Sequence, residues 1–140
     1  MNLKLILSVF MLSTYSLFGQ SVKKCDTAIL VQTSEKIGKL SQEEIIAFLS
    51  TFGEDCKNNI EFSEWSNELL FTIMNTQTNL TLTTIEKFEN KIELDVILKD
   101  LNSPLSDIEI KKLISQVNEV NIKPLLKKQI LINLNIADKK

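Results

Sequence analysis

The sequence predicts an all-α fold of six or seven short amphipathic helices, and three observations support this prediction. The 140 residues include only 3 Gly and 2 Pro, so residues that interrupt helices are scarce. Apolar side chains recur at the i, i+3, i+4 and i+7 spacing of helices that face a core. Two Ser-x-x-Glu sequences, at 41–44 and 106–109, have the form of capping boxes at helix starts.

The first half of the chain contains three predicted helices. The first covers 22–37 and is followed by Gly38, and the second runs from the 41–44 capping box to Gly53. The third begins near Asn59 or Ser63. Its apolar face is expected to be buried, with the Trp as a core anchor, and comprises Phe62, Trp65, Leu69, Leu70, Ile73 and Met74.

The second half begins with an ambiguous segment, 75–84, in which leucines alternate with threonines. Because no second strand candidate exists to pair with it, we expect a loop that leads into a short helix near Ile85. Further helices are predicted near 94–101, after the 106–109 capping box, and from Asn121, with a proline in the last helix's first turn. Short connections make consecutive helices antiparallel pairs, arranged as a compact bundle or as a short HEAT-like stack.

Residues 1–19 are predicted to be a secretory signal peptide. Lys4 precedes an apolar stretch at 5–12, which is shorter than the roughly 20 residues that span a bilayer. The sequence around Gln20 resembles the cleavage region of proteins exported by Bacteroidetes-type bacteria. An N-terminal anchor or a buried helix is the alternative. The prediction is one helical domain over 20–140, exported to the periplasm or medium, with no membrane span after cleavage.

Export places the two cysteines, Cys25 and Cys56, in an oxidising compartment, where disulfides persist. Two cysteines allow only one intramolecular pairing, which would fasten the first helix to the turn after the second. The alternative is two separate buried thiols. No C-x-x-C sequence is present to indicate a redox role.

The composition excludes several chemistries. The chain has no His and no Arg, which excludes His-based acid–base catalysis, His-ligated metals and bidentate guanidinium clamps. A net charge of −2 without a basic stripe argues against nucleic acid as a partner. No motif implies a cofactor. The sequence therefore predicts a small exported binding protein without catalytic activity, whose partner is another protein.

Acidic residues gather around the single tryptophan and form a candidate patch for docking a basic partner. The alternative is an ordinary solvated helix face. The patch comprises Glu54, Asp55, Glu61, Glu64, Trp65 and Glu68.

The segment 53–64 also resembles an EF-hand calcium loop in its second half. Ile60, Glu64 and Trp65 stand at the positions of the apolar residue, the bidentate glutamate and the following aromatic. The first half departs from the pattern, because Gly53 replaces the first aspartate and Lys57 stands where an oxygen ligand belongs. This resemblance implies an alternative function, a calcium-responsive helix–loop–helix module with Asp55 and Glu64 among its ligands.

Overall fold

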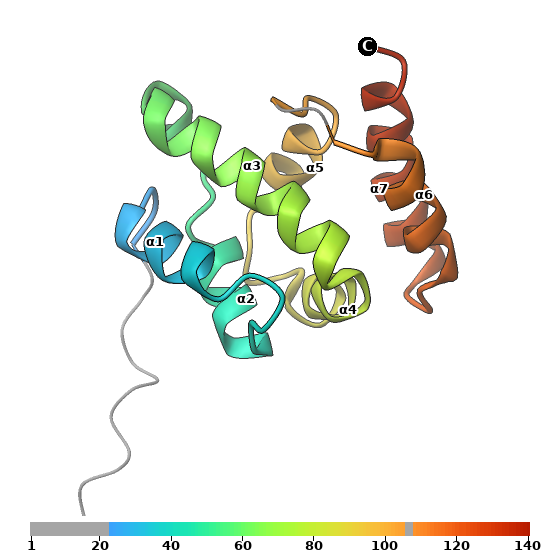
Figure 1. Ribbon diagram of the computed structural model, residues 1–140, viewed down its shortest axis with the longest axis horizontal. Coiled ribbons are helices and arrows are strands. Elements are labelled where there is room, and N and C mark those ends of the chain that lie inside the picture. Colours follow the sequence, from blue (N-terminus) through green and yellow to red (C-terminus); the bar gives the residue numbers. More distant parts are fainter. Residues whose placement is uncertain (1–22, 106–107) are drawn as a thin grey trace, which may run out of the picture.

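The computed structural model describes residues 23–105 and 108–140, which form seven α-helices and a short 3-10 helix, η1 (Figure 1). No strand occurs in these residues, so the all-α prediction is confirmed. The elements are α1 (Thr27–Glu35), α2 (Gln42–Ser50), η1 (Glu54–Asn58), α3 (Ile60–Thr76), α4 (Thr78–Phe88), α5 (Leu94–Asp100), α6 (Ile110–Glu119) and α7 (Pro124–Ala137).

The helices pack as a compact bundle around α3, which at 17 residues is the longest described helix. It contacts η1, α1, α4 and α6, and it crosses the centre of the molecule in Figure 1. Helices two elements apart also lie against each other, as α2 does against α4 and α5 against α7. The buried apolar side chains of all seven helices join in one core cluster.

Several predicted helix ends are confirmed. Ser41 and Glu44 form both hydrogen bonds of a capping box at the start of α2. Asn59 caps α3, because its side-chain oxygen accepts from the backbone N–H of Phe62 at 3.1 Å. The first helix is shorter than predicted: α1 covers Thr27–Glu35 and its C-cap is Lys36. Gly38 lies in the turn beyond this cap with a φ of +81°, a conformation that glycine adopts without steric cost.

The segment 75–84 is not a loop, and the prediction for it was wrong. Only Gln77 separates α3 from α4, and five threonines donate their hydroxyls to backbone carbonyls four residues earlier. Thr81 and Thr84 are fully buried. Because these hydroxyls are bonded within the helix, their methyl groups can pack in the core, and threonine does not end the helix.

Two other helix starts differ from the prediction. Ser106 and Asp107 lie outside the described residues, and α6 begins only at Ile110, without a side-chain cap. The cap position of α7 is Lys123 rather than Asn121, because Pro124 provides the fixed φ that suits a first helical turn.

The predicted signal peptide, at 1–19, also lies outside the described residues and stays a prediction. Within 23–105 and 108–140, no helix has the length and apolar character needed to cross a membrane.

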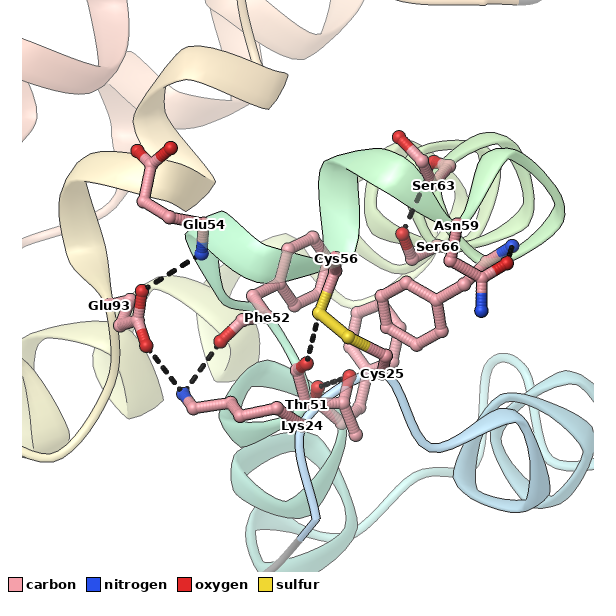
Figure 2. The surroundings of a disulfide bond; sticks show 12 residues. Lys24, Cys25, Thr51, Phe52, Glu54, Cys56, Asn59, Ser63, Ser66 and Glu93 are labelled. Carbon is pink, nitrogen blue, oxygen red and sulfur yellow. Dashed lines mark hydrogen bonds and ion pairs between the residues drawn. A yellow bond between two sulfur atoms is a disulfide. The ribbon is translucent and has the colours of Figure 1, made fainter.

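A disulfide between Cys25 and Cys56 fastens the segment before α1 to η1, as the sequence predicts (Figure 2). The backbone N–H of Cys25 donates to the carbonyl of Thr51 at 2.9 Å. The Lys24 ammonium donates to the Phe52 carbonyl at 2.6 Å and lies 3.1 Å from the Glu93 carboxylate, so an ion pair reinforces the covalent link. The α1–α2 hairpin is thereby held to η1 and to the start of α5.

Reducing the disulfide should destabilise the bundle. The bond closes a loop across a sequence separation of 31, so its loss should cost about 3–4 kcal/mol through unfolded-chain entropy. The melting temperature should fall by roughly 10 °C when reductant is present, measured by circular dichroism. The double variant Cys25→Ala/Cys56→Ala is the control and should not respond to reductant. An unchanged melting temperature of the reduced wild type would contradict the expectation.

Candidate functional site

An open groove of about 560 Å³ runs along the N-terminal half of α3 and is the candidate binding site. Its lining consists of Glu61, Glu64, Trp65, Glu68 and Leu105, and we call it the α3 groove. The four residues from α3 recur at three- and four-residue intervals, which places them on one side of the helix. The groove therefore contains four of the six residues of the predicted patch.

Trp65 lines this groove and is only partly buried, so its predicted role as a core anchor needs correction. The other predicted face residues of α3 are buried, among them Phe62, Leu69 and Ile73. Trp65 packs against this core at the edge of the buried face, where the helix surface turns toward solvent. Its indole is thus fixed on one side and accessible on the other.

Leu105, the groove residue outside α3, is held in position by the buried side-chain amide of Asn67, which the sequence did not point to. Asn67 is 4% exposed, and its Nδ2 donates to the carbonyls of Asp100 and Ser103 at 3.2 and 3.3 Å. Its Oδ1 accepts from the backbone N–H of Leu105 at 3.2 Å. One side chain of α3 therefore holds the chain after α5 in place beside Trp65. The only sequence signal was a polar residue next to an apolar helix face.

The α3 groove combines exposed apolar surface with negative charge. The Leu105 side chain is 60% exposed, and Ile60, one turn before Glu64, is 69% exposed. Within the described residues, none of Glu61, Glu64 and Glu68 forms an ion pair. Three carboxylates without an ion pair in the described residues line the groove together with an indole and a leucine, which suits a ligand that is both basic and apolar.

The remaining two residues of the predicted patch lie elsewhere. Glu54 and Asp55 belong to η1 and do not line the α3 groove. The ammonium groups of Lys57 and Lys99 both contact the Glu54 carboxylate, the second at 2.9 Å. Hydrogen bonds from these lysines lower the pKa of Glu54 to about 2. Glu54 therefore has intramolecular partners, unlike the glutamates of the groove.

The described part of the chain contains no set of side chains that could serve as the ligands of the alternative calcium site. No three side chains of the Asp, Glu, Cys or His type come together there as a metal-binding group. Residues 54–58 form the 3-10 helix η1, and Lys57 contacts Glu54 at one end of it. Asp55 and Glu64 stand on different elements, η1 and α3.

A second notable acidic group is the partly buried carboxyl of Asp100, which lies close to η1. Asp100, the last residue of α5, lines a small pocket together with Phe52, Phe62 and Lys57. Burial raises the pKa of Asp100 from 3.8 to about 6, and the nearby Lys57 ammonium offsets part of that shift. The charged carboxylate is therefore a cost to the folded protein near neutral pH.

Comparison with protein-family models, curated proteins and solved structures finds no match to this chain. The residues of the α3 groove themselves are thus the basis for assigning a function.

Removing the Asn67 amide should loosen the groove wall. Asn67→Ala leaves the Ser103 carbonyl and the N–H of Leu105 without this partner and removes one of two donors to the Asp100 carbonyl, at an expected cost of about 2–3 kcal/mol in urea unfolding. Hydrogen exchange of the Leu105 amide should also accelerate. Asn118→Ala, which removes an exposed amide bonded only within α6, should change stability by less than about 0.5 kcal/mol. Equal effects of the two variants would contradict the role of Asn67.

The Asp100 carboxyl should make stability depend on pH. Its folded-state pKa of about 6 exceeds the ordinary 3.8, so the folded state binds the proton more tightly. The resulting stabilisation is complete below about pH 4 and is lost as pH rises through 6. Asp100→Asn should therefore be about 1–2 kcal/mol more stable than wild type at pH 7.5, after allowance for partial exposure.

Urea unfolding at pH 4 and pH 7.5 measures this difference. Asp95→Asn, which removes an exposed carboxylate from the same helix, is the matched control and should not reproduce the gain in stability at pH 7.5. A wild type and an Asp100→Asn variant with parallel pH profiles would show that Asp100 has no such effect.

Proposed function

We propose that this chain is a small exported binding protein that holds a basic, amphipathic segment of a protein partner in the α3 groove. The observation that carries the proposal is the combination of the accessible Trp65 face, the exposed Leu105 side chain and a rim of three glutamates without ion pairs in the described residues. No bond-breaking step is part of this function.

The chemistry of the groove favours a helix or an extended segment that presents both lysines or arginines and apolar side chains. An apolar side chain placed on Trp65 would remove apolar surface of both partners from water. Cations beside Glu61, Glu64 and Glu68 would fix the orientation and accelerate association, with an effect that salt screens. Because the indole is already held against the core, little side-chain freedom is lost on binding.

Export is supported by the disulfide together with the N-terminal sequence. Cys25 and Cys56 are joined, and such bonds persist in oxidising compartments. The apolar stretch at 5–12 has the length of a signal peptide's hydrophobic region.

A fluorescence titration tests the proposal, because Trp65 is the only tryptophan in the chain. A synthetic amphipathic helical peptide of leucine and lysine should shift the Trp65 emission to shorter wavelength and should bind more weakly at high salt. Replacing Glu61, Glu64 and Glu68 together by Gln should weaken binding by about tenfold, since each rim charge contributes a fraction of a kcal/mol.

Two controls make the titration specific. A peptide with glutamate in place of lysine should not bind, and Glu119→Gln, which removes an exposed charge on α6, should bind like wild type. Equal binding of the lysine peptide to wild type and to the triple variant would contradict a role of the groove carboxylates. No emission change at any peptide concentration would contradict the proposed function.

A further inference from the structure

The outer face of α7 carries apolar side chains that no described part of the chain covers. Leu125, Ile132 and Ile136 are 71%, 50% and 43% exposed. Their spacing of seven and four residues places them in one line along the helix. The opposite face of the same helix, with Leu126, Ile130 and Leu134, is buried against the core. The helix is thus apolar on two sides, although only one side belongs to the core.

Lysines accompany the exposed apolar line. Lys128 lies one turn after Leu125, and Lys139 lies just beyond the end of the helix on the same side. Neither forms an ion pair within the described residues, and Asp138 is the C-cap residue of this helix. We call this surface the α7 stripe: Leu125, Lys128, Ile132, Ile136 and Lys139.

The α7 stripe and the α3 groove are complementary in chemistry. The stripe offers a helical surface of aliphatic side chains and lysines, whereas the groove offers an aromatic and an aliphatic side chain with three glutamates. The helix α7 has 14 residues, about 21 Å of length, which is enough to extend over the groove-lining turns of α3. Figure 1 shows α7 at the right of the molecule and the start of α3 at its upper left.

We propose that the partner held by the α3 groove is a second copy of this chain, which inserts its α7 stripe. This inference rests on the proposed function of the groove and names its partner. The contact is head-to-tail, because each copy uses its groove toward one neighbour and its stripe toward another. Such contacts continue into rings or filaments unless the rotation between copies closes them after two.

Sedimentation velocity over a range of concentrations tests this proposal. The wild type should form species larger than a monomer, and high salt should reduce them, because lysines and glutamates face each other across the contact. Leu105→Asp blocks the groove, and Ile132→Asp blocks the stripe. Each change introduces an aspartate at an exposed apolar position and should weaken self-association by at least about tenfold.

The decisive measurement is the equimolar mixture of these two variants. Each retains one intact surface, so the mixture should form a species of two chains and nothing larger. Val31→Asp places the same aspartate at an exposed position on α1, outside both surfaces, and should associate like wild type. Dimerisation of Leu105→Asp alone would show packing of stripe against stripe and would overturn the proposal. A wild type that remains monomeric at every concentration would also overturn it.

A charge exchange within one chain gives an independent check. Glu64→Lys should weaken self-association, and adding Lys128→Glu to the same chain should restore it, because the exchanged charges again attract each other. Failure of the second change to restore association would contradict the contact between groove and stripe. If the chain is monomeric but binds the lysine peptide, the self-association is wrong and the proposed function stands. If the chain does neither, both are wrong.

Discussion

The burial of one side of α3 is the constraint on which the rest of the structure depends. Leu70, Ile73 and Met74 are almost completely removed from water, and α1, α4 and α6 all pack against this helix. An amphipathic helix buries one side against the core and exposes the other to solvent. In the N-terminal half of α3, the exposed side carries Glu61, Glu64 and Glu68. That side is the α3 groove. The position of the candidate site is therefore a consequence of how the core is packed.

Two polar side chains in or beside the core, those of Gln77 and Asn67, fix one segment of the chain to another. Gln77, in the link between α3 and α4, donates to and accepts from the backbone of Leu40 at 2.9 and 3.0 Å, which holds the loop between α1 and α2. Asn67 does the same for the chain after α5. Bonds of this kind contribute modestly to net stability but are costly to break, so they select one arrangement of the loops. The outer wall of the groove exists because of such a bond.

Some charged side chains of this protein are paired with an opposite charge, whereas others have no such partner in the described residues. Around η1, Glu54 and Glu93 are paired with lysines, and these contacts reinforce the disulfide junction. The glutamates of the α3 groove and Lys128 of α7 have no such pairs in the described residues. The unpaired acids and the unpaired lysines each accompany exposed apolar side chains, and this combination is the basis for proposing both surfaces as binding sites.

The sequence by itself determined the helical class, the cap at Ser41 and the pairing of Cys25 with Cys56, because these depend on local periodicity, on short-range hydrogen bonds and on there being only two cysteines. For the start of α3 it left Asn59 and Ser63 open, and the structure places the cap at Asn59. The sequence also indicated an acidic patch near Trp65. Only the tertiary structure decided that the 75–84 threonines continue a helix, since their burial against α2 and α6 outweighs a weak local preference.

Tertiary contacts likewise decided the composition of the candidate site. Glu54 is separated from the patch because lysines from η1 and α5 reach it, and Leu105 joins the groove because Asn67, 38 residues earlier, holds its backbone. Both outcomes depend on which segments meet in space. The Lys57 contact with Glu54 is local, but Lys99 meets Glu54 across 45 residues and Asn67 meets Leu105 across 38, and spacing along the chain does not show such distant contacts.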